Sequence, residues 1–233
     1  ITEKDNYSML EKKDSTEPEK KNESSSDKEK VEDNVEPESK VAVETVPSPY
    51  IKNDPLKKKF CLVLDLDETL IHFKIDNKFP DQGEIRMRPY MFEFLEQLDR
   101  YYELIMFTAA SEEYGVSICE EIEHNRPFFA YKFYRQHTKI EGEDFIKDLE
   151  RIGRPIEKTL IVDNMAVNFR SQKENGVLIK PYYGSTRTDK ALYYLCEILL
   201  KIVIDPSNTD IRDGLKRYKD DIINKVTSTI GWT

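Results

Sequence analysis

Three apolar runs that end in polar residues are spread along the chain. Residues 59–66 (KFCLVLDL), 103–109 (ELIMFTA) and 158–164 (KTLIVDN) each contain an unbroken apolar stretch. Such stretches predict strands that are buried on both faces, as in a parallel sheet. Residues 176–184 (GVLIKPYYG) predict a shorter fourth strand.

Segments with helical periodicity lie between these runs. In residues 89–102 the apolar positions recur at helical spacing after a proline in the first turn; they are Met91, Phe92, Leu95 and Leu98. Ser111 can cap a second helix over residues 111–123, which has two acidic residues in its first turn. Residues 188–204 predict a long amphipathic helix that stops before Pro206.

Shorter patterns predict the remaining elements. Residues 71–90 alternate and turn at 81–83 (DQG), which predicts a β-hairpin, and residues 128–138 predict a strand or a second hairpin. Residues 145–153 (FIKDLERIG) predict a short helix that ends at a glycine. A terminal helix is expected to dock through Leu215, Tyr218, Ile222 and Val226.

The alternation of strands and helices indicates an α/β protein. It predicts a Rossmann-like parallel sheet with helices on both faces and the hairpin as a small β insertion. Composition separates this domain, residues 51–233, from residues 1–50, which hold 14 acidic residues against 8 lysines and no glycine or arginine. Such a segment cannot bury enough apolar surface to offset the entropy of ordering, so we expect a disordered acidic tail.

Charge, hydropathy and cysteine content argue against several classes of protein. The formal net charge is −9 and no basic face is evident, which argues against direct binding to nucleic acid. No apolar run reaches the roughly 20 residues that a membrane helix needs. Cys61, Cys119 and Cys196 lie far apart in apolar patterns and are expected to be buried free thiols of a reducing compartment. The first residue is Ile1, so a targeting segment could precede it.

Polar residues follow the predicted buried strands. Asp65 and Asp67 follow the first, Thr108 the second, and Asp163 and Asn164 the third. Because ligands of open α/β sheets bind outside the carboxyl ends of the strands, we expect these side chains to converge. Clustered carboxylate and amide oxygens suit a magnesium ion, which would offset the cost of burying the carboxylates.

The same residues predict chemistry on a phosphate group. An aspartate can attack phosphorus to form an aspartyl-phosphate, and a second acid can protonate the departing oxygen and later activate water. Two residues spaced by two in an extended strand share a face, so Asp65 and Asp67 can reach one substrate. Lys147 and the Thr108 hydroxyl could neutralise or hydrogen-bond the phosphoryl oxygens.

Four segments carry a resemblance to a known family; in order they are 65–73 (DLDETLIHF), 107–110 (FTAA), 145–154 (FIKDLERIGR) and 160–164 (LIVDN). They resemble the four motifs of the haloacid-dehalogenase (HAD) superfamily. More narrowly, they are similar to its NLI-interacting-factor-like, or small CTD-phosphatase, branch, as are RPYMFEFLEQL, FYRQHT and ENGVLIKPYYG. The resemblance covers about residues 60–204 and implies a HAD-like fold.

The resemblance also implies roles for the catalytic residues. Asp65 matches the nucleophile and Asp67 the general acid and base, while Thr108 and Lys147 match the pair that contacts phosphate. Thr69 matches the threonine that shapes the loop of the first motif, and we expect it to contribute to substrate binding.

A metal site and a substrate contact follow from the same resemblance. The family's magnesium ion is held by the nucleophile's carboxylate, the backbone carbonyl at Asp67 and the side chain at Asn164, with Asp163 acting through water. Arg135 matches an arginine that lies near the bound phosphopeptide.

The chain departs from the family pattern in two places. Met165 and Ala166 stand where the family usually has Ser-Pro, and the interval from Thr69 to Thr108 is short, so the hairpin beside the substrate is small. The interval from Thr108 to Lys147 is too short for a large cap domain, which favours an open site and a protein substrate.

These observations predict a magnesium-dependent protein serine/threonine phosphatase that acts through an aspartyl-phosphate, on RNA polymerase II C-terminal repeats or another phosphoprotein. A non-catalytic binding module on the same fold, such as a mitochondrial import receptor, and a phosphatase of small metabolites are the alternatives. We expect a monomer in the nucleus or cytoplasm. Residues 1–50 are expected to be dispensable for the chemistry.

Overall fold

The computed structural model describes residues 46–75, 83–184 and 188–228. Residues 81–82 of the expected hairpin turn and residues 1–45 of the expected tail lie outside these ranges.

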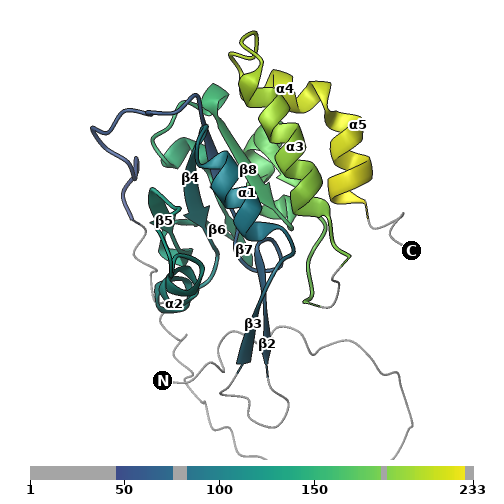
Figure 1. Cartoon of the computed structure of the whole chain (residues 1–233). Helices are drawn as coiled ribbons and strands as arrows, with labels where there is room; N and C mark the ends of the chain where they lie inside the picture. The colour runs from purple at the N-terminus through teal and green to yellow at the C-terminus, as the bar shows by residue number, and fades with distance from the viewer. Residues whose placement is uncertain (1–45, 76–82, 185–187, 229–233) are drawn as a thin grey trace, which may run out of the picture. The chain divides into compact units, whose positions relative to one another are not determined.

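A five-stranded parallel sheet forms the centre of the molecule, as the apolar runs predicted (Figure 1). Its strand order is β5-β4-β1-β8-β9, with β1 in the middle. The strands are β1 (Phe60–Leu64), β4 (Tyr102–Phe107), β5 (Tyr131–Phe133), β8 (Thr159–Asp163) and β9 (Gly176–Leu178).

The register of the sheet places the ends of the three central strands at one level. Leu64, the last residue of β1, pairs with Met106 of β4 and with Val162 of β8. Because the strands are parallel, the polar residues that follow them leave the sheet at the same edge.

All the α-helices of the described residues pack into one core cluster, against the face of the sheet that carries Phe60, Leu62 and Leu64. They are α1 (Met91–Leu98), α2 (Glu112–Ile122), α3 (Ala191–Ile204), α4 (Ile211–Arg217) and α5 (Lys219–Ile222). A π-helical turn, η6 (Ile223–Thr227), follows, and Leu215, Ile222 and Val226 dock this terminal region as predicted.

The buried stripe of α1 differs from the expected one at a single position. Phe94 is buried, whereas Phe92 is 40% exposed. Met91, Phe94, Leu95 and Leu98 follow the i, i+3, i+4, i+7 spacing of one helix face, and Phe92 falls on the other side. Including Phe92 in the core was therefore wrong.

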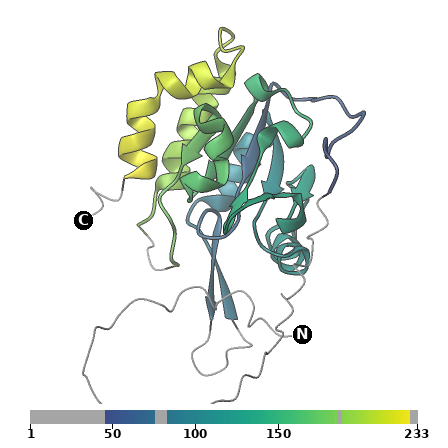
Figure 2. The ribbon, with the colours of Figure 1, turned by 180° about the vertical axis from the view of Figure 1, so that it is seen from behind.

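Short 3₁₀ helices cover the opposite face of the sheet, where Cys61, Val63 and Ile105 pack into a second cluster. They include η3 (Leu149–Arg151) and η5 (Ala166–Asn175). The right-handed crossover of parallel strands explains why the helices are divided between the two faces. The chain crosses the sheet in one direction from β1 through β4 to β5, and in the opposite direction from β8 to β9. The connecting segments of the two halves therefore lie on opposite faces. Helices thus lie on both faces (Figure 2).

Two β-hairpins stand outside the sheet. The expected one joins β2 (Ile71–Ile75) to β3 (Gly83–Met87). The second, β6 (Lys139–Glu141) and β7 (Asp144–Ile146), takes up the start of the segment that was expected to be a short helix. Only η3 remains of that helix. The other short helices are η2 (Arg135–His137) and η4 (Ile156–Lys158).

Residues 46–54, here called the strap, belong to the folded domain. The backbone N–H groups of Tyr50 and Ile51 donate to the carbonyl oxygens of Arg151 and Ile152, both at 2.9 Å. The expected boundary between tail and domain after residue 50 is therefore too late, because residues 46–50 are already held by the domain.

Two further expectations concern membranes and thiols. Within the described ranges, no helix has the length and apolar character needed to cross a bilayer. Cys61, Cys119 and Cys196 are free and buried, which confirms their assignment as core thiols.

Candidate active site

A buried lysine joins two of the predicted site carboxylates. Lys147, just after β7, donates to Asp65 Oδ1 and, at 2.7 Å, to Asp163 Oδ2. Asp65 follows β1 and Asp163 ends β8, so the neighbouring strands bring together groups that are far apart in sequence. Lys147 and Asp163 have no exposed area, and Asp65 has only 5%.

Burial and charge determine how this triad titrates. Burial would lower the pKa of Lys147, but the charges of Asp163 and Asp65 outweigh it and raise the pKa above its usual value. Burial, followed by the nearby charge of Asp163, raises the pKa of Asp65 to about 7 despite the contact with Lys147. The triad therefore has one more acid than base, and further positive charge would favour ionised Asp65.

The first motif forms a tight loop around Asp65. The Thr69 hydroxyl donates to Asp65 Oδ2 at 2.7 Å, which fixes the carboxylate from the side opposite Lys147. Glu68 adopts a left-handed conformation with φ of 56°, which is uncommon for a residue with a side chain. The backbone N–H of Tyr182 holds the Glu68 carbonyl at 2.8 Å. The loop is thus fixed by long-range contacts, and Thr69 contacts the carboxylate of the nucleophile candidate.

Asp67 faces a tyrosine that the sequence analysis did not identify. The hydroxyl of Tyr114, in the first turn of α2, donates to Asp67 Oδ1. Burial raises the pKa of Asp67, and the hydrogen bond from Tyr114 and the charge of Lys147 offset only part of this effect. A raised pKa suits a group that must give and take a proton. The only sequence signal was a tyrosine soon after the Thr108 motif.

Thr108 lies at the end of β4, as expected. It is buried, its backbone N–H donates to Phe133 O at 3.0 Å, and its hydroxyl accepts from Ala110 N–H at 3.0 Å. The hydroxyl also lowers the pKa of the Asp67 carboxyl, against the effect of burial. Thr108 therefore lies in the same cluster as the carboxylates.

The third strand end is organised by another residue that the sequence analysis missed. Asn168 Nδ2 donates to Asp163 Oδ1 at 3.0 Å, and the Met165 N–H donates to the same oxygen at 2.8 Å. The backbone N–H of Lys147 also donates to the backbone carbonyl of Asn168, at 2.6 Å. Asn164 follows Asp163 and is partly exposed.

Arg135 is brought to the same region. It begins η2, its Nε donates to the Ala109 carbonyl at 2.8 Å, and its guanidinium lies 5.1 Å from the ring centre of Phe145 in β7. Ala109 directly follows Thr108. The side chain is partly exposed and bridges the Thr108 loop and the second hairpin.

The donor set fits magnesium. No group of three or more histidine, cysteine, aspartate or glutamate side chains suited to a metal occurs within residues 46–75, 83–184 and 188–228. Magnesium needs fewer protein ligands than such a group provides, because it binds through one or two carboxylates and keeps several waters. Substrate phosphate completes its coordination. The oxygens expected to hold the ion are those of the Asp65 carboxylate, the Asp67 carbonyl and the Asn164 amide, from residues that follow the neighbouring strands β1 and β8. A cation there would offset the extra negative charge of the triad.

The parallel sheet with clustered carboxylates at its carboxyl edge is the arrangement that the HAD-like resemblance predicted. Residues 60–212 match the family model described as NLI interacting factor-like phosphatase. The chain belongs to this family. The match confirms the resemblance found in the sequence.

Curated relatives include CTD nuclear envelope phosphatase 1 of Xenopus tropicalis, 34% identical over 181 residues that make up 69% of this chain and 72% of the relative. CTD small phosphatase-like protein 3 of Caenorhabditis elegans is 32% identical over 180 residues, 70% of this chain and 62% of the relative. Among solved structures, the fission yeast RNA polymerase II CTD phosphatase Fcp1 bound to beryllium fluoride gives a TM-score of 0.46 at 16% identity. That match covers 74% of this chain and 58% of the other. The structural likeness is too low to support a conclusion by itself.

Proposed function

We propose that the protein is a magnesium-dependent protein serine/threonine phosphatase that acts through an aspartyl-phosphate. The observation that carries the proposal is the Asp65–Lys147–Asp163 triad at the carboxyl edge of the sheet, with Asp67 held beside it by Tyr114. Each role predicted for a phosphoryl-transfer residue has a side chain in this cluster. A binding module would have no need for two carboxylates and a lysine buried together, which is costly in free energy.

The two half-reactions follow from the positions of the two aspartates. A carboxylate oxygen of Asp65 attacks phosphorus, the bond from phosphorus to the seryl oxygen breaks, and Asp67 gives its proton to the departing oxygen. In the second step Asp67 takes a proton from water, which attacks the phosphorus and releases Asp65 and inorganic phosphate. Lys147 and Thr108 hold the phosphoryl oxygens in both steps.

Magnesium, held by Asp65, the Asp67 carbonyl and Asn164, would supply positive charge to the phosphoryl oxygens and lower the repulsion that the nucleophile meets. Asp163 keeps Lys147 charged and oriented, and Asn168 and the Met165 N–H fix Asp163 in turn. This chain of contacts supports Asp163 as a residue that acts on the site without binding the metal directly.

A protein substrate is supported by the small size of the elements that border the site. Within the described residues, the insertions between the site motifs are two short hairpins, and neither is a cap domain. Relatives are named as CTD phosphatases. We infer a phosphoserine on an extended protein segment as the substrate, with RNA polymerase II C-terminal repeats as one candidate. We propose that Arg135 binds its flank.

The names of relatives also support a location. CTD nuclear envelope phosphatase 1 is named for the nuclear envelope, and we propose nuclear association for this chain. We further propose that the catalytic unit is a monomer.

The proposed function is tested at the nucleophile. Asp65→Asn should lower turnover of p-nitrophenyl phosphate by more than about a thousandfold, because asparagine cannot form the phosphoenzyme. Asp221→Asn is the matched control, since the Asp221 side chain is 44% exposed and pairs only with Lys225 in the part of the chain that the structure describes. Circular dichroism verifies folding of both variants.

Wild-type rates with the Asp65→Asn variant would reject this assignment. Hydrolysis of sugar phosphates in preference to phosphoserine peptides would point to a metabolite phosphatase. Absence of hydrolysis in the wild-type protein, with magnesium present, would favour the binding module.

A further inference from the structure

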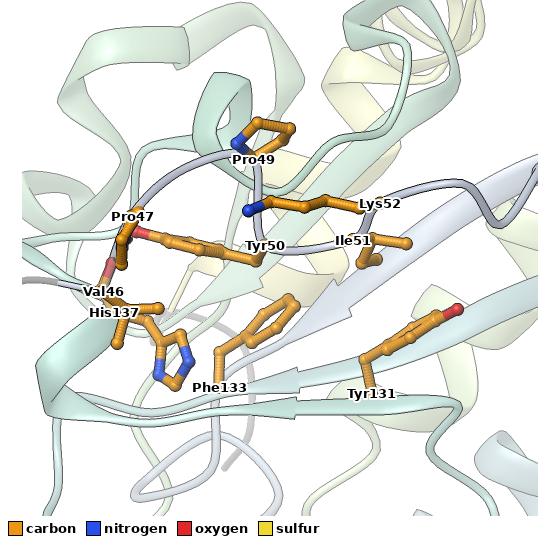
Figure 3. A pocket seen from close by; sticks show the side chains of 9 residues that line it. All are labelled: Val46, Pro47, Pro49, Tyr50, Ile51, Lys52, Tyr131, Phe133 and His137. Atoms are coloured by element: carbon orange, nitrogen blue, oxygen red, sulfur yellow. Dashed lines mark hydrogen bonds between the residues drawn. The ribbon is translucent and has the colours of Figure 1, made fainter.

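The strap lies over a part of the domain that the catalytic motifs do not include. With Tyr131, Phe133 and His137 it lines a cavity of about 440 Å³, which Figure 3 shows from close by. Apart from Lys52 and His137 the lining is aromatic and aliphatic, and nothing in the described residues indicates a ligand for it. The contacts of the strap with its neighbours are more informative than the cavity.

One set of contacts fixes the strap to η3. Besides the two backbone hydrogen bonds from Tyr50 and Ile51, Arg151 Nη2 donates to the Val46 carbonyl at 3.0 Å. The Arg151 guanidinium lies 5.2 Å from the centre of the Tyr50 ring, a cation–π distance. Ile51 is buried in the second core cluster.

A second set fixes the strap to η2. The ring of Tyr50 lies 5.2 Å from that of Phe133 and 5.0 Å from that of His137. The Tyr50 hydroxyl donates to the His137 carbonyl, and the Val46 N–H donates to the Gln136 carbonyl at 3.3 Å. Tyr50 and Val46 therefore each contact both short helices, Val46 through its backbone and Tyr50 also through its side chain.

These two helices are next to functional residues. Arg135 is the first residue of η2, and η3 begins at Leu149, two residues after Lys147. Each helix is a single 3₁₀ turn of three residues, which has little stability of its own. The position of each turn must come from its tertiary contacts, and Tyr50 supplies contacts to both.

The fit between strap and η3 leaves no room for adjustment at Gly153. Gly153 has φ of +91°, and a Cβ there would lie 2.5 Å from the Ile51 carbonyl oxygen and 3.1 Å from Pro49 Cβ. Because glycine has no Cβ, Gly153 lets the strap pack directly on the backbone that follows η3.

We propose that Tyr50 is a positioning residue of the phosphatase: it couples η2 to η3 and so fixes the placement of Arg135 relative to Lys147. The proposal rests on the proposed function, in which Arg135 binds the flank of a phosphopeptide and Lys147 holds its phosphate. The strap is then part of the catalytic unit, although it precedes the first motif.

The test uses the full-length chain with two substitutions at Tyr50 and one matched control. Tyr50→Phe removes only the hydroxyl, and Tyr50→Ala also removes the ring. Tyr102→Phe is the control, because the buried Tyr102 hydroxyl also donates to a backbone carbonyl, that of Leu199 at 2.8 Å. Tyr102 begins β4, at the opposite end of the strand from Thr108.

We expect kcat/KM for a phosphoserine peptide to fall about tenfold in Tyr50→Ala and about threefold in Tyr50→Phe, mostly through KM, since binding and not chemistry is disturbed. For p-nitrophenyl phosphate, which has no peptide flank, the losses should be smaller. Tyr102→Phe should leave both substrates unaffected even where it lowers Tm. Equal losses in Tyr50→Phe and Tyr102→Phe would overturn the proposal.

A double-mutant cycle distinguishes positioning from general stability. If Tyr50 acts through Arg135, Tyr50→Ala should cost little further kcat/KM in a protein that already carries Arg135→Ala. Additive losses in the cycle would contradict the proposal, because they would mean that Tyr50 acts independently of Arg135.

Hydrogen exchange gives a readout that does not depend on activity. The N–H groups of Thr138 and Ile152 close the turns of η2 and η3 at 2.9 and 3.2 Å. Both should exchange faster in Tyr50→Ala and remain unchanged in Tyr102→Phe. Unchanged exchange in Tyr50→Ala overturns the coupling whatever the activity. An inactive wild-type protein with faster exchange in Tyr50→Ala would reject the proposed function and leave the coupling of the two turns established.

Discussion

At the scale of single residues, one cation organises the site. Lys147 has no contact with solvent and donates to both Asp65 and Asp163. Removing one partner of a buried ion pair leaves an uncompensated charge, which costs about 3–5 kcal/mol, whereas exposed pairs contribute little. The lysine is therefore needed both for the shape of the site and for its charge.

Lys147→Met tests this role. We expect turnover of p-nitrophenyl phosphate to fall by about a hundredfold or more, as for the loss of one donor to a transition-state oxygen. Lys225→Met is the control, because Lys225 is half-exposed and pairs with Asp221 on the surface. Steady-state kinetics below the melting temperature of both variants make the measurement. Activity within threefold of the wild type in Lys147→Met would exclude Lys147 from the phosphate site.

The thiols give a second prediction at this scale. Burial raises the pKa of the Cys119 thiol to about 12 and that of Cys196 to about 11, and it raises the pKa of Cys61 further. Since the thiolate is the reactive form, the native protein should resist iodoacetamide at pH 8 and keep its activity. Intact mass should show no adduct in the native protein and three in urea. An adduct that abolishes activity without unfolding would show an accessible reactive thiol.

At the scale of elements, a buried ion pair connects the first motif to α3. Arg88 follows β3 and donates to both carboxylate oxygens of Asp189, at 3.2 and 3.0 Å, and to the Thr69 carbonyl at 3.0 Å. Asp189 also accepts from the Ala191 N–H at the start of α3, at 2.9 Å. The backbone of the nucleophile loop is thus tied to a helix more than a hundred residues away in the chain.

The pair makes stability depend on pH. Burial alone would raise the pKa of Asp189, but the hydrogen bond and charge of Arg88 outweigh it and lower the pKa below the ordinary 3.8. Because the folded pKa is depressed, the contribution is fully present above the unfolded pKa of about 4 and is lost as pH falls through the folded value. Asp189→Asn should therefore cost about 3 kcal/mol at pH 7 and progressively less below pH 4.

Chemical denaturation of wild type and Asp189→Asn between pH 7 and pH 3 measures this difference. Asp99→Asn is the control, because Asp99 pairs with Arg126 at the surface, where their side chains are 36% and 41% exposed. A destabilisation of Asp189→Asn that stays constant to pH 3 would mean that the carboxylate charge is not what stabilises the pair.

At the scale of the whole molecule, the folded unit begins earlier in the chain than composition suggested. Removing residues 1–45 leaves every described contact of the strap in place and should leave kcat/KM unchanged. Removing residues 1–51 takes away Val46, Tyr50 and Ile51, and should lower both Tm and kcat/KM for a phosphopeptide. Two truncated proteins, compared by thermal melting and kinetics, measure this. Equal activity of the two would place the boundary after residue 51.

Local sequence patterns by themselves determined the central strands, most of the α-helices and the main candidates for the site. The apolar runs predicted β1, β4 and β8 because strands buried on both faces must be apolar throughout. Polar residues directly after such runs could lie only at the carboxyl edge of a parallel sheet, which is why the pattern alone predicted that Asp65, Thr108 and Asp163 converge. These signals are local, so they can be recognised in the sequence without the structure.

Tertiary structure alone decided the contacts between segments distant in the chain. Tyr114 on Asp67, Lys147 on Asp163 and Arg88 on Thr69 join residues from different segments, and no periodicity marks these contacts. The path of the strap was likewise hidden, because its backbone hydrogen bonds go to η3, about a hundred residues further along the chain. Periodicity shows which residues are apolar, but the partners of a polar group depend on how the elements pack.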